Sequence, residues 1–541
     1  MSRAVRLVVP AALATALALA LAAPAGAATV PAAAAAASSS VQLSYPPPKQ
    51  PPVPRGQKRY RFRYGPITVH AGTNYIALPR KAAPKPKVDG FITRIAPNMT
   101  FRNGRVPRTD IMHLHHGVWI NLSGGGDLFG TGAAATFFAS GEEKTIFQMP
   151  KGTGYYSRGA DRWMINYMIH NYTAETFKVY IDYTLDFIPK SSALGKRTTP
   201  LFPIWMDVEG GRAYPVYDVL KGSGGRSGRI TFPEGYTNPY PNSTRPRNVF
   251  TVPQDMTLYT TAGHLHPGGM WDDLNLRRPG VNVQPRKGGP IRGDAPNSVR
   301  LFRSKAVYFD PNGPVSWDMA MTGTPSNWRV QLRKGDQLSI SSTYETRRAS
   351  WYESMGIMVV YASLQGKGAD PFTSAIPQNG RPTHLQYPEN RNYGGRKLRG
   401  VPDFRRLPDG RAPGNKVAIR DYQYTYGGWG ESGKRLDPPT VKVGQSLTFT
   451  NYDALTDRDS PLTVPHTVTG CRQPCNGATG ISYPLANGGP IDSAQLALGP
   501  FGFTAASNKL SWQTPKTLGP GTYTYYCRMH PFMRGAFRVE A

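Results

Sequence analysis

A cysteine, a histidine and a methionine lie within seven residues of one another near the end of the 541-residue chain. They are Cys527, His530 and Met533, and a second histidine, His466, stands upstream in the run V-P-H-T-V. A soft thiolate and a thioether stabilise Cu(I), and imidazole suits both oxidation states of copper. Two histidines, one cysteine and a weakly bound methionine are the ligands of trigonal type 1 copper sites, which transfer electrons. The four residues therefore predict a mononuclear type 1 copper centre.

The run C-x-x-H-P-F-M-R-G resembles the ligand loop of amicyanin, a cupredoxin, and P-H-T-V resembles the first histidine motif of that family. The resemblance covers residues 413–541, where short strands such as Ser446–Thr450 and Tyr523–Tyr526 are expected. It implies a Greek-key β-sandwich whose rigid strands hold the copper ligands, so that electron transfer requires little reorganisation.

Six of the ten histidines fall into three groups within the preceding part of the chain. The groups are H-L-H-H at 113–116, the single His170, and H-L-H at 264–266. His264 and His266 are two apart, so on an extended strand they project from the same face and can bind one metal together. His115 and His116 are adjacent and point to opposite faces of a regular strand. To share a metal, they require a bulge or a strand end.

The order of these groups resembles the copper type II, ascorbate-dependent monooxygenases, the family of peptidylglycine α-hydroxylating monooxygenase and dopamine β-monooxygenase. The resemblance assigns His115, His116 and His170 to one copper, and His264, His266 and Met355, the predicted catalytic residues, to another. It implies that the first copper stores an electron and that the second reacts with O2 and a C–H bond of an organic substrate. His113 is expected to have a supporting or structural role, with an exchange of roles with its neighbours as the alternative.

This region departs from the family in three ways. Residues 57–365 contain no cysteine, although the family's enzymes have disulfides there. Ala262 stands two residues before H-x-H, where the peptide hydroxylase has a substrate-binding arginine, and Val359 stands where it has a tyrosine. A peptidylglycine substrate is therefore not expected, and the substrate is left open.

Composition favours strands over helices throughout the chain. Its 58 glycines and 51 prolines argue against long helices, and short β-rich runs between turns indicate antiparallel sheets. We expect an all-β chain with two consecutive antiparallel, jelly-roll-like β-sandwiches followed by the cupredoxin sandwich. The predicted segments are a signal peptide at 1–27, an Ala/Ser/Pro-rich linker at 28–56, sandwiches at 57–195 and 196–365, a basic Pro/Gly-rich linker at 366–412, and the cupredoxin domain at 413–541.

The start of the chain has the pattern of a cleavable secretory signal. Arg3 and Arg6 precede an apolar run, and A-G-A at 25–27 follows it. An uncleaved membrane anchor is the alternative, although the run contains Pro10 and is barely long enough to span a bilayer. We expect a protein that is secreted or associated with the cell envelope, with no transmembrane segment after cleavage.

Cysteine usage and charge agree with export. Cys471 and Cys475 lie in a turn-rich loop and are expected to form a disulfide in an oxidising compartment, which leaves Cys527 for a metal. The net charge of +30, from 64 Lys and Arg against 34 Asp and Glu, favours contact with an anionic cell-envelope polymer. The basic residues are dispersed and no nucleic-acid module is recognisable, so specific nucleic-acid binding is not expected.

These features favour a secreted multicopper protein with one type 1 copper and two further mononuclear coppers. As a copper-dependent monooxygenase, it would receive electrons through the fused type 1 domain from a redox partner or a small reductant. A flexible tether raises the effective concentration of such a donor to the ~mM range. The alternative is a non-catalytic exported copper-binding or electron-transfer protein. A third hypothesis is a structural protein whose basic surface binds the envelope.

Overall fold

The structure, a computed structural model, describes residues 44–541 apart from several short segments. The gaps are 78, 80, 110, 125–133, 142–143, 209–215, 234–247, 284–287, 295–296, 311–312, 315–316, 388–399, 430–436, 457–463, 477–485 and 499–508. The predicted signal peptide at 1–27 lies outside the described residues. Strands dominate, and the α-helix found in this part, α1 (Asp453–Thr456), has four residues, which confirms the all-β prediction. None of the helices described is long and apolar enough to cross a membrane.

The first sandwich packs two sheets around an aromatic and aliphatic core. One sheet has the order β3 (Asn74–Ala77), β10 (Trp163–Asn171), β6 (Met112–Asn121), β7 (Ala135–Gly141); the other contains β9 (Thr153–Ser157), β4 (Gly90–Phe101), β11 (Phe177–Pro189), β2 (Lys58–Val69), with the short β8 (Phe147–Gln148) beside β4. Along β11, Val179, Ile181, Tyr183 and Leu185 are buried and alternate with less buried residues. This period of two is what one core-facing side of a strand requires.

The second sandwich continues the larger sheet. One of its sheets has the order β14 (Arg229–Phe232), β21 (Gln337–Glu345), β17 (Gly269–Arg277), β18 (Ser298–Tyr308). The other has the order β19 (Met319–Gly323), β16 (Met256–Leu265), β23 (Gly356–Ser363), β12 (Thr199–Asp207). Shorter elements are β13 (Tyr217–Val219), β15 (Phe250–Thr251), β20 (Val330–Leu332), β22 (Trp351–Ser354), β24 (Arg381–Pro382), η1 (Gly195–Arg197) and η2 (Gly225–Ser227). The start of β12 pairs with β9 in parallel, which joins the two sandwiches.

Strands β16 and β23 are buried along their whole length. Their side chains enter two different cores: Leu258 and Val360 pack in the second sandwich, whereas Ala262 and Val359 pack against the first. A register shift in β16 between Leu258 and Thr260 puts Ala262 on the opposite face from Leu258. Because side chains alternate along a strand, His264 lies on the same face as Ala262 and is directed toward the first sandwich.

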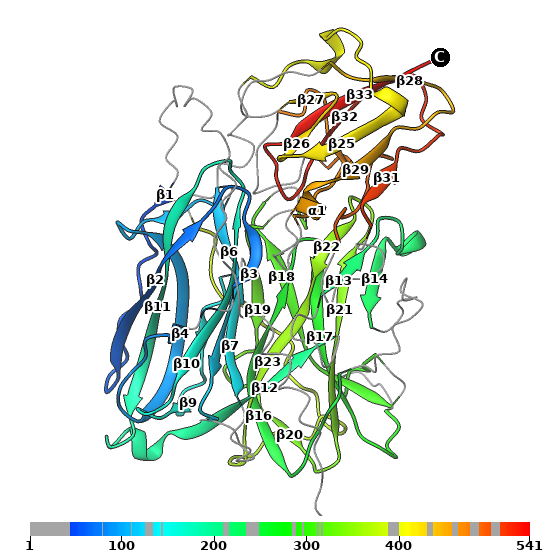
Figure 1. Cartoon of the computed structure of the whole chain (residues 1–541). Helices are drawn as coiled ribbons and strands as arrows, with labels where there is room; N and C mark the ends of the chain where they lie inside the picture. The colour runs from blue at the N-terminus through cyan, green and yellow to red at the C-terminus, as the bar shows by residue number, and fades with distance from the viewer. Residues whose placement is uncertain are drawn as a thin grey trace, which may run out of the picture.

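The C-terminal domain is a smaller pair of sheets. One sheet has the order β26 (Gln423–Tyr424), β25 (Lys416–Arg420), β29 (Thr448–Asn451), β31 (Ser511–Gln513). The other has the order β27 (Gly428–Trp429), β33 (Arg534–Glu540), β32 (Gly521–Tyr526), β30 (Thr469–Gly470), with β28 (Thr440–Lys442) beside β33. The 3-10 helices η4 (Phe404–Arg406) and η5 (Pro413–Asn415) precede it. Figure 1 shows the blue-to-cyan first sandwich beside the green second one, with the C-terminal domain, yellow to red, at one end of them.

Parts of both predicted linkers are packed against the domains. In the 28–56 segment, Ser44–Tyr45 forms β1, pairs with β5 (Val106–Pro107), and buries the Tyr45 ring. In the 366–412 segment, Ala369 accepts a hydrogen bond from the Gln331 N–H at 2.9 Å, and Phe404 is buried against Trp429. Their buried side chains are spaced irregularly along coil, so neither the period of a strand nor that of a helix marks them in the sequence.

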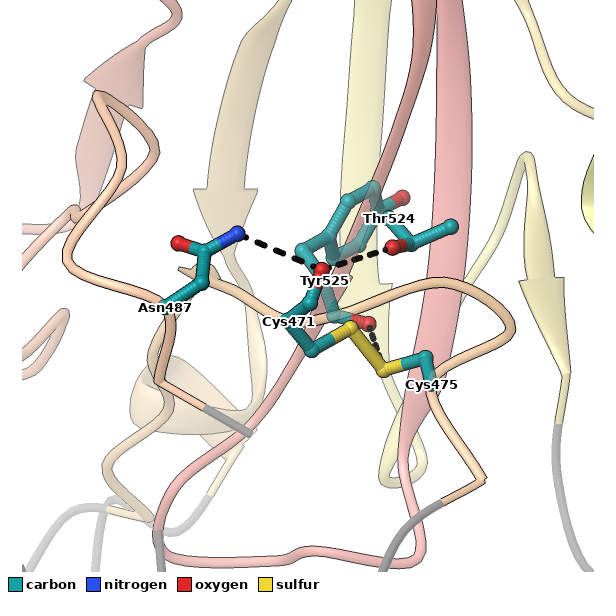
Figure 2. The surroundings of a disulfide bond; sticks show 5 residues. All are labelled: Cys471, Cys475, Asn487, Thr524 and Tyr525. Atoms are coloured by element: carbon teal, nitrogen blue, oxygen red, sulfur yellow. Dashed lines mark hydrogen bonds between the residues drawn. A yellow bond between two sulfur atoms is a disulfide. The ribbon is translucent and has the colours of Figure 1, made fainter. Parts of the chain in front are cut away.

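Cys471 and Cys475 are joined by a disulfide beside strand β32 (Figure 2). The Cys471 N–H donates to the carbonyl of Thr524 at 3.0 Å, and the Thr524 hydroxyl donates to the carbonyl of Cys471 at 3.0 Å. Strand β32 leads directly to Cys527. The disulfide therefore braces the strand that positions the predicted metal-binding thiol.

Replacing both disulfide cysteines, Cys471→Ser with Cys475→Ser, is expected to lower the free energy of unfolding of this domain by about 2 kcal/mol. That value is the loop-closure entropy of so short a loop, with a separation of 4 residues. The midpoint of urea unfolding, followed by tryptophan fluorescence, measures the loss. An unchanged midpoint relative to the parent protein would show that the disulfide does not stabilise this domain.

Candidate metal centres

The imidazoles of His466 and His530 and the thiol of Cys527 face one another in the C-terminal domain. The two Nδ1 atoms are 3.1 Å apart, and each lies 3.7 Å from the Cys527 Sγ. All three side chains are fully buried, and within the described residues they form a group of three ligand atoms inside 4.8 Å. With the buried Met533 we call these residues the C-terminal site.

The size of this triangle fits one metal ion. Bond lengths of about 2.0–2.1 Å to nitrogen and about 2.3 Å to sulfur place trigonal N and S donors about 3.8 Å apart, and two N donors about 3.5 Å apart. The observed nitrogen–sulfur distances of 3.7 Å match closely, and the nitrogen–nitrogen distance of 3.1 Å corresponds to a narrower angle. The donor set of two imidazoles and a thiolate suits copper.

The ligand loop is closed by its own backbone. Cys527 follows the end of β32, and His530 and Met533 precede β33. The Cys527 N–H donates to the Met533 carbonyl at 3.2 Å, and the Met533 N–H donates to the His530 carbonyl at 2.8 Å. The Thr467 N–H is directed at the Cys527 sulfur, 3.4 Å away. These bonds hold the donors before any metal is bound.

Electrostatics in the site favour the thiolate. Burial raises the pKa of the Cys527 thiol, but its contacts with the His466 and His530 imidazoles outweigh burial and bring the pKa well below its ordinary value. Burial lowers the pKa of His466, whereas Asp453 and Cys527 raise it, and the resulting pKa is about 9. The metal-free site thus holds a thiolate beside a positive charge, and the thiolate is the form of cysteine that binds metals.

The outer nitrogens of both imidazoles are hydrogen-bonded, which leaves each Nδ1 directed at the centre of the site. His466 Nε2 donates to Asp453 Oδ2 at 2.9 Å, and His530 Nε2 donates to the carbonyl of Gly72 at 3.0 Å. Partners of this kind fix ring orientation in metal sites. Gly72 belongs to the first sandwich, has φ +63°, and a Cβ there would lie 2.5 Å from Tyr422 Cε1. Only glycine fits this close contact.

Six buried histidines form a second group, between the two sandwiches. We call His113, His115, His116, His170, His264 and His266 the histidine cluster. Four of these rings contact Trp317, whose ring centroid lies 4.7 Å from that of His113, 5.0 Å from that of His115, 6.0 Å from that of His170 and 5.9 Å from that of His266. Ring nitrogens of His115 and His116 lie 3.3 Å apart, and those of His264 and His266 lie 3.2 Å apart.

A bulge in β6 allows adjacent histidines to face one site. His116 pairs with Met168 and Leu114 pairs with Ile169, so His115 is the extra residue in the ladder. An extra residue reorients the side chains on either side of it. The sequence indicated that a shared metal would need such an irregularity, and the structure has it at this position.

The two predicted copper sets are brought together rather than kept apart. The rings of His115 and His266, one from each set, have centroids 4.5 Å apart. His170 is at the edge of the cluster, where its ring centroid lies 5.5 Å from that of His113. The assignment of individual imidazoles to separate ions stays a prediction. Met355 packs in an apolar group with Val216 and Ile357.

Sequence reasoning missed Glu353, a buried carboxylate at the cluster. Its Oε2 lies 4.0 Å from His115 Nε2, and it accepts a hydrogen bond from the Asn74 amide at 3.3 Å. Glu353 is two residues before the predicted ligand Met355, but one acidic residue in a strand carries no sequence signal. Only the fold brings it to His115.

Five of the six imidazoles of the cluster are held in the form that binds metals. Burial lowers the pKa of His113 and of His116 to about 3. Burial also lowers the pKa of His115, His170 and His266 well below the ordinary value. Neutral imidazole is the metal-binding form, so these five side chains need no deprotonation at neutral pH.

The C-terminal site and the histidine cluster are in direct contact. His170 Nε2 donates to the carbonyl of Met529 at 2.7 Å, and Met529 lies between Cys527 and His530 in the ligand loop. On the other side of the loop, Arg528 donates a hydrogen bond to the Ser350 carbonyl. One loop therefore contacts both the first and the second sandwich.

Comparison with known proteins gives partial likenesses to copper proteins. A Cu(I) form of an amicyanin variant is 21% identical, covering 27% of this chain and 92% of amicyanin, with a TM-score of 0.14. An oxidised amicyanin variant is 22% identical, covering 25% and 89%, also with a TM-score of 0.14. A copper-containing nitrite reductase from Thermus scotoductus is 12% identical, covering 79% and 87%, with a TM-score of 0.17.

No family model matches the chain, and no curated protein matches it. At the identities and TM-scores above, the likeness to solved structures identifies neither a ligand nor an activity. Both must be inferred from the residues of the two sites.

Acid is expected to destabilise the metal-free protein through the buried imidazoles. The unfolded chain protonates His113 and His116 below about pH 6.5, whereas the fold keeps them neutral to a pKa of about 3. Their contribution to stability is therefore present above pH 6.5 and lost as pH falls, by about 1.4 kcal/mol per pH unit for each histidine. Urea unfolding of the metal-free protein between pH 7 and pH 5 measures this slope.

His116→Asn should flatten that slope, whereas His70→Gln, at an exposed histidine, should leave it unchanged. Equal slopes for His116→Asn and the parent protein would contradict the account.

Proposed function

We propose that the protein is an exported copper oxidoreductase in which the C-terminal site is the entry point for electrons and the histidine cluster is the site of reaction. More specifically, we propose a copper-dependent monooxygenase that uses O2 to hydroxylate a C–H bond of an organic substrate. The observation that most supports oxidoreductase activity is the hydrogen bond of 2.7 Å between His170 and the carbonyl of Met529, which connects the two sites. The choice of monooxygenase rests on the order of the histidine groups in the sequence.

His466, Cys527, His530 and Met533 would hold copper, which supplies one-electron exchange when bound. The chain itself keeps the donors dry and preformed: all four side chains are at most 1% exposed. Rigid, hydrogen-bonded ligands need little rearrangement between oxidation states. The same rigidity fixes the distance from the ligand loop to the cluster.

His170 would connect the two sites. Its Nε2 contacts the backbone beside the ligand His530, and its ring faces His113 in the cluster. The two sites are thus connected by the hydrogen bond of His170 to Met529 and by the ring contact of His170 with His113. This continuity favours transfer of electrons into the cluster over exchange with an outside partner alone.

The surroundings of His264 support an uncharged reacting group. A cavity beside it is lined by side chains that include Phe138, Phe147, Ala262 and Val359. Ala262 and Val359 pair across β16 and β23, and both occupy positions where the peptide hydroxylase has substrate-binding polar residues. The described residues that line this small cavity include no Lys or Arg side chain that would bind a substrate carboxylate.

One observation favours the alternative of a non-catalytic copper-binding or electron-transfer protein. Within the described residues, three ligand atoms come within 4.8 Å of one another in the C-terminal site but not in the histidine cluster, whose closest ligand atoms are in pairs. An electron carrier requires only the first of these centres.

Metal content and oxygen uptake separate the two functions. The monooxygenase is expected to bind more than one copper per chain and to consume O2 with ascorbate as reductant. His264→Ala should reduce the uptake at least tenfold, because it removes one member of the closest imidazole pair. His70→Ala is the control. One copper per chain and no oxygen uptake would leave only the carrier.

His170→Phe should slow electron transfer between the sites, while the copper ligands stay in place because the ligand loop is also held by its own backbone hydrogen bonds. An aromatic ring is kept while the hydrogen bond to Met529 is lost. We expect the blue absorption of copper-loaded protein to remain and its reoxidation after pulse-radiolytic reduction to slow at least tenfold. Met168→Leu, on the same strand, is the control. Reoxidation at the parent rate would show that His170 is not on the path.

A further inference from the structure

We propose that Glu353 is a metal ligand at the histidine cluster, where it and His115 bind the same divalent first-row transition-metal ion. The inference rests on the proposed second metal centre and names a donor that no sequence motif indicates. It also adds a carboxylate to the cluster, where the resemblance gave His115 only imidazoles as fellow ligands and placed the thioether of Met355 with His264 and His266.

The distance between the two donors fits a shared ion. Glu353 Oε2 and His115 Nε2 are 4.0 Å apart, too far for a hydrogen bond. Donors that each lie about 2.0–2.2 Å from one ion are at most about 4.3 Å apart. The imidazole is fully buried, and its Nε2 has no hydrogen-bond partner among the residues that the structure describes. An ion between the two atoms would give the His115 Nε2 a partner.

The backbone at Glu353 is held in an unusual conformation. Its φ is +49°, a left-handed value that residues other than glycine rarely adopt. Such strain persists where the surrounding structure imposes it and is concentrated at functional sites. Here β22 pairs with β13, and the Asn74 amide donates to the carboxylate. Asn74 itself pairs with His170 across β3 and β10, so the carboxylate is tied to the cluster's own sheet.

Met355, the thioether predicted from the sequence, competes poorly with Glu353 for this position. Its side chain packs with Val216 and Ile357, whereas the carboxylate of Glu353 is directed at His115. Thioether favours Cu(I), while imidazole with carboxylate suits divalent ions such as Cu(II), Fe(II) and Zn(II). The ion expected at this centre is therefore a divalent transition-metal ion.

The strand that carries Glu353 also contacts the ligand loop of the C-terminal site. Arg528 donates to the Ser350 carbonyl, and its guanidinium lies 4.6 Å from the centroid of the Trp351 ring. The residue that follows Cys527 is thus packed on the strand of Glu353, just as Met529 is bonded to His170. Glu353 is therefore joined to the ligand loop through the backbone of its own strand.

Titration of the full chain with Cu(II), after one equivalent has filled the C-terminal site, tests the inference. The second ion is followed by its electron paramagnetic resonance spectrum, while the blue absorption of the first reports correct folding in the same sample. Glu353→Gln is expected to weaken binding of the second ion by about 100-fold and to change its spectrum. Glu345→Gln, the same change at a carboxylate bonded to the Arg347 N–H, should leave both unaltered.

The outcomes separate this inference from the proposed function. A parent protein that binds no second ion would overturn both. A second ion bound by Glu353→Gln with the parent affinity and spectrum would overturn the inference alone. A larger loss in Met355→Leu than in Glu353→Gln would assign the position to the thioether. If Glu353→Gln does not fold, infrared spectra of the parent protein decide, because binding must shift a carboxylate band.

Discussion

The hydrogen bond between His170 and the carbonyl of Met529 joins what would otherwise be two separate candidate metal sites. Both groups are buried, and a buried carbonyl must be paired. The loop that carries Cys527 and His530 is consequently fixed against the first sandwich. The carbonyl of Gly72 completes the orientation of His530 in the same contact. The C-terminal domain therefore does not finish its own site: the neighbouring domain supplies part of its outer hydrogen bonding.

The histidine cluster follows from the way the two sandwiches are packed. Strands β16 and β23 are buried on both faces, so the face that carries His264 is pressed toward the first sandwich. A bulge in β6 adds His115 to the same space. Burial of several neutral imidazoles is unfavourable for a core, since apolar side chains would fill the space at less cost. A chain that keeps them there, with a strained carboxylate at Glu353, has the features of a functional centre.

The sequence predicts these features unequally, for physical reasons. Cys527, His530 and Met533 are close in sequence, so their chemistry can be recognised before any fold is known. The all-β class follows from the content of glycine and proline. The contact between His115 and His266 joins positions 151 residues apart, and local patterns carry no information about it. Packed coil at both predicted linkers has no periodicity, and Glu353 has no motif.

Anomalous diffraction at the copper edge, from crystals of copper-loaded protein, tests the central claim most directly. The claim is that one chain holds two kinds of metal centre in contact through a single ligand loop. The account predicts one anomalous peak among His466, Cys527 and His530, and at least one more within the histidine cluster, on the far side of His170. A single peak in the C-terminal domain, with the cluster empty at full copper loading, would contradict it.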